Sequence, residues 1–191
     1  MMVLFEYLSA AFLLVLVAYL VFRVLVLRDY HRYARLTPLT SFLELAVWLS
    51  YVFFPHIYNP PDWWLVWFAK TPDSSIHKFT GTLLVALGMI IALVAMAKLG
   101  LRTTMGNKQG ILQQAGLYSV SRNPQLVGGG LAALGVTILW PSWYALGWLA
   151  LYGVIGHLMV LAEEEHLRST LGESYLEYCE RVPRYVKNPW K

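Results

Sequence analysis

Charge and cysteine are both scarce in this sequence. Only 14% of its 191 residues are charged, and Cys179 is the one cysteine. A single cysteine excludes an internal disulfide framework and a four-cysteine zinc site. The histidines show no paired ligand spacing such as His-x-x-x-His, so we expect no metal site. They are His31, His56, His77, His157 and His166.

Apolar residues are abundant instead. They make up 58% of the chain, and the mean hydropathy is +0.51, which is typical of an integral membrane protein. The formal net charge of +4 comes from basic residues at the ends of apolar segments. In that position they orient spans and meet lipid headgroups, so we expect membrane lipids as partners and no nucleic acid.

The apolar segments predict an all-α membrane domain with about five spans. Residues 3–27, 40–58 and 76–99 form the first three. The first is followed by arginines and has no cleavage site, so we expect it to be a retained span. Residues 126–162 are too long for one span of roughly 20 residues. The turn at 140–143 divides them into a short helical hairpin.

A proline-interrupted segment and several glycines add detail to this arrangement of spans. Residues 59–75 are interrupted by proline and carry Trp63, Trp64 and Trp67, which favours an interfacial segment. Glycines in the third span and in the hairpin predict close helix packing. They are Gly81 and Gly88, then Gly128, Gly129, Gly130 and Gly135, then Gly147, Gly153 and Gly156. We expect one domain, 1–191, with the spans and interfacial segment in 1–100 and a cofactor-binding core in 101–191.

Basic residues predict the orientation. With the N-terminus outside, twelve lysines and arginines fall on inner segments, and only Lys70 and Lys78 fall on outer ones. This excess places the C-terminus on the cytosolic side.

The longest polar break in the second half runs from Gly110 to Gly128. Arg122-Asn123-Pro124 then opens into apolar sequence, which is how a helix begins when proline holds its first turn. Such a start can hold an anionic group. The alternative is a cytosolic loop with a proline cap.

The C-terminal tail carries a second pattern. Glu163-Glu164-Glu165 follows the last apolar run, although a helix C-terminus disfavours carboxylates, so we expect either a continuing helix or partners for them. An amphipathic cytosolic helix is predicted next, interrupted near Gly172. It could simply anchor the tail at the interface. Its apolar positions are Leu167, Leu171, Tyr175 and Tyr178.

Together these motifs resemble the isoprenylcysteine carboxyl methyltransferase family, a group of integral membrane enzymes that includes phospholipid methyltransferase relatives. Size and span count are similar to a prokaryotic, archaeal-type member. The resemblance covers about residues 100–186. The motifs are Gly116-x-Tyr118, Arg122-Asn123-Pro124-x-x-x-Gly128, Glu163-Glu164-x-x-Leu167, Leu171-Gly172-x-x-Tyr175-x-x-Tyr178 and Arg181-Val182-Pro183-Arg184.

The resemblance implies S-adenosylmethionine as methyl donor and S-adenosylhomocysteine as product, with the site on the cytosolic side. Arg122 and Glu163 would position the donor, since a carboxylate suits its ammonium and Arg122 or the helix start suits its carboxylate. Tyr118 would lie against the sulfonium. The implied cofactor residues are Gly110, Ile111, Leu112, Gln113, Tyr118, Asn123, Pro124, Gln125, Leu126 and Glu163.

Three positions depart from the family pattern, and one of them is Leu126, which stands where the pattern has its final tyrosine. Asn123 replaces the usual histidine of Arg-His-Pro-x-Tyr, and an amide cannot carry a proton. Met159 stands where the isoprenylcysteine enzymes place a basic residue facing the substrate carboxylate.

The prediction is therefore methyl transfer to a lipophilic or prenylated acceptor. An isoprenylcysteine-type carboxylate is favoured and an amine lipid is the alternative. A carboxylate needs no base, whereas an amine must lose a proton; His157, His166 and the glutamates 163–165 are candidates to take it. The rivals are an NADPH-dependent sterol-type reductase, disfavoured by few basic residues near 110–128, and a non-enzymatic membrane subunit.

Overall fold

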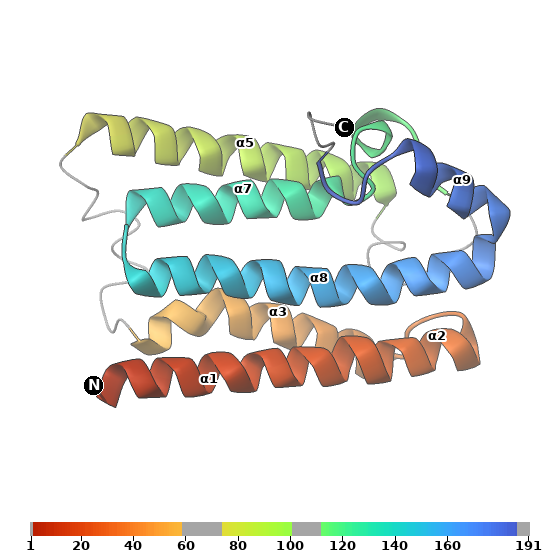
Figure 1. Cartoon of the computed structure of the whole chain (residues 1–191), viewed down its shortest axis with the longest axis horizontal. Helices are drawn as coiled ribbons and strands as arrows, with labels where there is room; N and C mark the ends of the chain where they lie inside the picture. Colours follow the sequence, from red (N-terminus) through yellow and green to blue (C-terminus); the bar gives the residue numbers. More distant parts are fainter. Residues whose placement is uncertain (1, 59–73, 101–111, 187–191) are drawn as a thin grey trace.

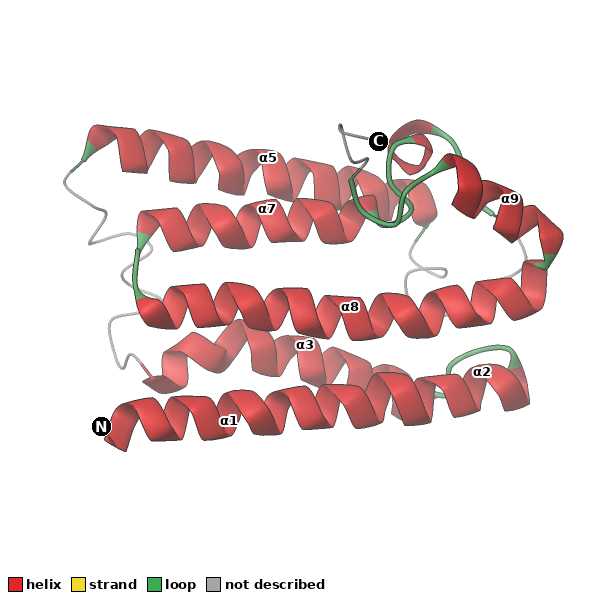
Figure 2. Ribbon diagram, in the orientation of Figure 1, coloured by secondary structure: helices red, strands yellow, loops and turns green. Residues whose placement is uncertain are grey.

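Helices make up all the regular structure that is described. The computed structural model describes residues 2–58, 74–100 and 112–186, and no strand occurs in these ranges (Figure 2). The predicted all-α class is confirmed. The predicted interfacial tryptophans fall within 59–73, outside the described residues.

The helices form an elongated bundle with α8 at its centre (Figure 1). One side is a long rod of α1 (Met2–Tyr19), a π-helical segment η1 (Leu20–Val26) and α2 (Leu27–Tyr33), with α3 (Pro38–Tyr58) packed on it and on α8. The other side is α5 (Ser75–Leu99) against α7 (Pro124–Leu139), and α7 also packs on α8 (Trp143–Leu171). A short 3-10 turn, η2 (Gly116–Ser119), and α9 (Glu173–Arg181) complete the chain.

Four of the described helices are long and apolar enough to cross a membrane. They cover Leu4–Tyr33, Pro38–Pro55, Ser75–Leu99 and Trp143–Leu171. The fifth apolar helix, α7, has 16 residues. At 1.5 Å per residue it is about 24 Å long, short of a hydrocarbon core of about 30 Å. The predicted five spans are thus four candidate spans and one shorter helix.

Two helix ends differ from the prediction. The first helix does not stop near residue 27 but runs to Tyr33, where Ala34 caps it with φ +53°. Asp29, fully buried, accepts hydrogen bonds from the Thr37 N–H at 2.9 Å and the Thr37 hydroxyl at 2.6 Å, which fixes the turn into α3. The second helix of the predicted short hairpin is not short, because α8 continues through the glutamates to Leu171 over 29 residues.

Aromatic side chains join α8 to the N-terminal side. Trp148 stacks on Tyr51 with ring centroids 4.9 Å apart, and its indole N–H donates to the Tyr51 carbonyl at 3.0 Å. Tyr7 donates to the Tyr144 carbonyl at 2.8 Å. Farther along α8, His166 stacks on Tyr30 at 3.9 Å. These pairs keep α1, α2 and α3 in register with α8.

Glycines make the contact between α5 and α7 very close. A Cβ on Gly88 would lie 2.5 Å from the Gly128 carbonyl oxygen and from the Ala132 nitrogen, and one on Gly135 would lie 2.6 Å from the Gly81 oxygen. The predicted close packing at Gly81 and Gly88 is confirmed. For Gly128 and Gly135 the partner is α5, not the other half of the hairpin as predicted.

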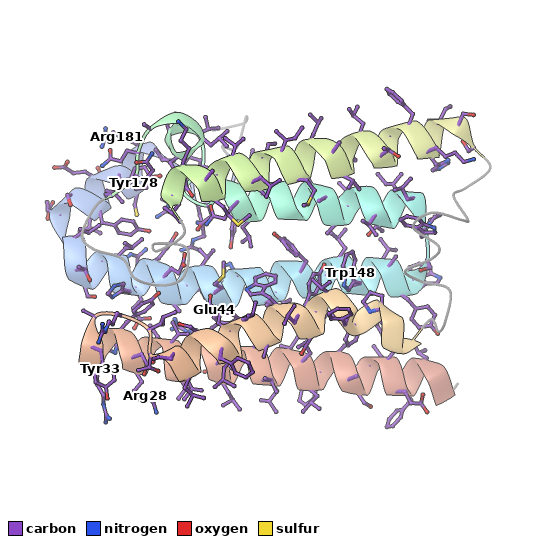
Figure 3. All side chains as sticks on the ribbon, turned by 180° about the vertical axis from the view of Figure 1, so that it is seen from behind. Arg28, Tyr33, Glu44, Trp148, Tyr178 and Arg181 are labelled. Carbon is purple, nitrogen blue, oxygen red and sulfur yellow. The ribbon has the colours of Figure 1, made fainter. Side chains whose placement is uncertain are left out.

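We call the end of the bundle where α2, α5 and α8 finish and α7 begins the site end. Figure 3 labels Arg28 and Tyr33 there, together with Tyr178 and Arg181 of α9. Lys98, in the last turn of α5, and Arg168, in the last turn of α8, belong to the same end. Of the basic residues predicted to lie on the inner side of a membrane, Arg28, Lys98, Arg168 and Arg181 are thus gathered at one end of the bundle.

Candidate functional site

The site end contains a recess because α8 is much longer than α7. The two helices are level where the turn at 140–142 joins them, and α8 has 29 residues against 16. The difference corresponds to about 20 Å of helix at the site end. Residues 112–123, α9 and the tail after it occupy this recess (Figure 1).

The start of α7 forms as its sequence predicts. Pro124 is its first residue and Asn123 its N-cap. The Asn123 N–H donates to the Ser121 hydroxyl at 3.1 Å, so the turn before the helix is closed by a local side chain. Pro124 suits this position because its fixed φ is helical and it has no N–H to satisfy.

The tail is hydrogen-bonded to this turn. The Arg122 N–H donates to the Pro183 carbonyl at 2.9 Å, and the Asn123 amide donates to the Arg184 carbonyl at 3.1 Å. Tyr178 donates to the Tyr118 carbonyl at 2.7 Å. We call this set of contacts the tail latch. It ties residues 118–123 to a segment about sixty positions later.

Apolar burial supports the tail latch. Tyr175, Tyr178 and Val182 are buried in one cluster, with Leu112 and Leu171 among the residues packed against them. Burial raises the pKa of Tyr178 to about 12, although the Arg122 charge opposes the shift. The aromatic face of the predicted amphipathic helix is therefore covered by protein in this structure.

A buried ion cluster lies beneath the tail latch. Arg184 forms a bidentate pair with Glu164, with its Nε 3.0 Å and its Nη2 2.8 Å from the two carboxylate oxygens. Arg122 lies 3.3 Å and Arg168 3.6 Å from the same carboxylate. Only 5% of the Glu164 side chain is exposed, and 10% of Arg122. The hydrogen bonds that Arg184 donates to Glu164 raise the pKa of Arg184 above its ordinary value.

Three of the implied cofactor residues come together beside α7. The Tyr118 hydroxyl lies 3.2 Å from the side-chain oxygen of Gln125 and 3.3 Å from the Ala95 carbonyl. Burial raises the pKa of Tyr118, and the nearby charge of Glu163 adds to this. A buried ring and an amide thus meet at a helix N-terminus, within electrostatic range of the Glu163 carboxylate.

The other implied residues are distributed around this point. Asn123, Pro124 and Leu126 are buried at the start of α7. Leu112 packs in the tail cluster instead, and Gln113 is half-buried. Gly110 and Ile111 lie outside the described residues.

Arg122 has a protein partner that the sequence does not reveal. Its guanidinium pairs with Glu164 and donates to the Cys179 sulfur. Its Nε is buried without a hydrogen-bond partner among the described residues. Arg122 therefore fits the implied methyl donor, because this unpartnered N–H is available for the carboxylate of the donor.

Two pockets open near the recess. One, of about 320 Å³, is lined by Arg23, Leu161, Glu164, Glu165, Arg168 and Arg184. The other, of about 350 Å³, lies between α7 and α8 and is lined by Leu126, Val127, Tyr152, Gly153, His157 and Tyr185. Sequence reasoning did not identify Arg184 or Tyr185 as site residues, and it named Glu164 only as one of three glutamates that were candidates to accept a proton. The three successive glutamates at a helix end were the available signal for Glu164.

Comparison with known proteins identifies the family. The family described as phospholipid methyltransferase matches residues 76–174, which are 99 of the 191 residues. The chain therefore belongs to the phospholipid methyltransferase family, a broad group of membrane methyltransferases. The match begins with α5 and ends just after α8, so it includes the start of α7 and the glutamate run. No curated protein and no solved structure matches the chain.

Proposed function

We propose that this protein transfers a methyl group from S-adenosylmethionine to the amine headgroup of a membrane lipid. The observation that carries the proposal is the contact between Tyr118 and Gln125 at the start of α7, inside the matched region and within electrostatic range of Glu163. The family supports a methyltransferase acting on lipid. The side chains gathered here suit S-adenosylmethionine, which presents a sulfonium cation, an ammonium and a carboxylate.

In this proposal each residue has one task. The donor supplies an electrophilic methyl group on a sulfonium sulfur. Glu163 binds the donor's ammonium, and the Tyr118 ring lies against the positive charge. The N-terminus of α7 and the Arg122 Nε–H face the carboxylate. Catalysis then comes from positioning the methyl donor against the acceptor and from the exclusion of water under the tail latch.

An amine is favoured over an isoprenylcysteine carboxylate for a structural reason. Met159 packs against the apolar core, so this position offers no charge to an acceptor carboxylate. Arg122 and Arg184 are held by Glu164. The carboxylate acceptor remains the second candidate, supported by the tail motif Arg181-Val182-Pro183-Arg184.

The proposal predicts selective donor binding. Purified protein in detergent should bind S-adenosylmethionine and not NADPH. Glu163→Gln should weaken donor binding by about 1.5–3 kcal/mol, the range for a charge-assisted hydrogen bond, or about 10- to 150-fold in Kd. Isothermal titration calorimetry measures both.

Glu165→Gln is the matched control. This glutamate is 43% exposed and pairs with Arg23 at 3.1 Å, so donor binding should not change. Methylation of paired amine and carboxylate lipids then distinguishes the two acceptors. Binding of NADPH, or of neither compound, would overturn the proposal.

A further inference from the structure

The pocket between α7 and α8 has apolar walls and one polar corner. Leu126 and Val127 line it from α7, Tyr152 and Gly153 from α8. The Tyr152 hydroxyl is already engaged, since it donates to the Leu126 carbonyl at 2.9 Å. The polar groups that remain on the wall are those of His157 and Tyr185.

These two residues form a hydrogen-bonded pair. His157 Nδ1 and the Tyr185 hydroxyl are 2.8 Å apart, although 28 positions separate them. Tyr185 follows Arg184 directly, so the ion pair with Glu164 fixes where its ring lies. An imidazole is the side chain best suited to accept a proton near neutral pH.

The pocket adjoins the implied donor site. Leu126 belongs to its wall and to the implied cofactor set, and the preceding Gln125 contacts Tyr118. A volume of about 350 Å³ accepts a small headgroup, and the acyl chains of a lipid would remain outside. The pocket is unfilled beside Gly153, since a Cβ there would meet no atom within 4 Å.

We propose that this pocket receives the amine headgroup of the acceptor lipid and that the Tyr185–His157 pair removes its proton. The inference rests on the proposed function. Lipid acyl chains would lie along the outer face of the α7–α8 pair, where Leu134 and Val154 are exposed.

An alkylammonium has a pKa near that of lysine, about 10.4, so at neutral pH it has no free lone pair. Its proton passes to the Tyr185 oxygen while the Tyr185 proton passes to His157 Nδ1. This leaves a neutral amine, a neutral phenol and an imidazolium. The amine nitrogen then forms its bond to the methyl carbon as the carbon–sulfur bond breaks, with the electron pair staying on sulfur. The imidazolium finally releases its proton to water.

The first test measures acceptor binding without any donor. Dihexanoyl phosphatidylethanolamine is titrated into wild type, Gly153→Leu and Gly153→Ala in detergent. The leucine should fill the pocket and weaken binding about tenfold or more, whereas alanine should change it little. Binding of S-adenosylmethionine should be the same in all three proteins. Unchanged acceptor binding by Gly153→Leu would overturn the pocket assignment.

The second test measures proton removal, and it does not depend on the fold of Gly153→Leu. His157→Gln and Tyr185→Phe should bind S-adenosylmethionine as wild type does, with kcat for amine methylation lower by about 10²–10⁴. The pH profile of kcat should differ between wild type and His157→Gln, because a glutamine side chain cannot accept the proton. The charged groups acting on Tyr185 are Arg184, Glu164 and Arg122, and both variants retain them.

The outcomes separate this inference from the proposed function. If wild type does not bind S-adenosylmethionine, the proposed function fails. If it binds the donor and methylates the amine lipid, but both variants keep the wild-type rate and pH profile, only the inference fails. Methylation of carboxylate lipids alone would also overturn the inference.

Discussion

Glu164→Gln is expected to lower the free energy of unfolding by about 3–5 kcal/mol, the usual cost of removing one partner of a buried ion pair. Glu164 supplies the carboxylate for Arg122, Arg168 and Arg184, at 3.3, 3.6 and 2.8 Å. Only 10% of the Arg122 side chain is exposed. With glutamine at position 164, this buried cation would lose the carboxylate that neutralises it. Denaturant unfolding in detergent micelles, followed by tryptophan fluorescence, measures the change.

Glu165→Gln is the appropriate comparison, because it removes the same charge one position later. Its ion pair with Arg23 is half-exposed, so a loss of about 0–1 kcal/mol is expected. Adding Arg184→Met to Glu164→Gln should recover part of the loss, since one uncompensated cation is removed. Equal stability of the two single variants would contradict the role of Glu164 as the centre of the cluster.

Gly128→Ala is expected to separate α5 from α7 and to cost about 1–3 kcal/mol or more, the range for inserting atoms into a packed interface. The new Cβ would lie 2.6 Å from the Ala92 nitrogen and 2.6 Å from the Gly88 oxygen. Both are backbone atoms and cannot move aside as a side chain can. Thermal unfolding of the purified variant in detergent is the measurement.

The control is Gly153→Ala, the same substitution on α8 where a Cβ meets no atom within 4 Å. It should be neutral or slightly stabilising, because alanine is the better helix former. If the two alanine variants unfold at the same temperature, the close α5–α7 contact does not contribute to stability. Gly88→Ala, which faces the same contact from α5, should resemble Gly128→Ala.

Local patterns predicted much of the fold. Apolar runs identified the long helices, because burial in lipid or protein requires continuous hydrophobic sequence. Pro124 marked the start of α7 through its own backbone geometry. The three glutamates left two expectations open, a continuing helix or partners for the carboxylates, and α8 does continue to Leu171. Its full length could not be predicted, because residues 162–171 are too polar for a span and their helix is stabilised by contacts distant in sequence. Glu164, for example, is neutralised by Arg122 and Arg184.

Fewer features of the candidate site than of the fold could be predicted from the sequence. The resemblance named Tyr118, Gln125 and Glu163. The structure brings the first two into contact and places Tyr118 within electrostatic range of Glu163. The His157–Tyr185 pair could not be found from spacing, because neither residue has a local partner that suggests the other. The role of Asn123 in the tail latch is equally non-local, since its amide donates to a carbonyl 61 positions away.

The tail latch also has a consequence for the order of events during synthesis. Residues 178–184 leave the ribosome after every candidate span. Until they arrive, Glu164 lacks Arg184, and Tyr118 lacks its hydrogen bond from Tyr178. Insertion of the apolar helices and closure of the tail latch are therefore successive stages of biogenesis, and a nascent chain halted between them would have its long helices before its tail latch could form.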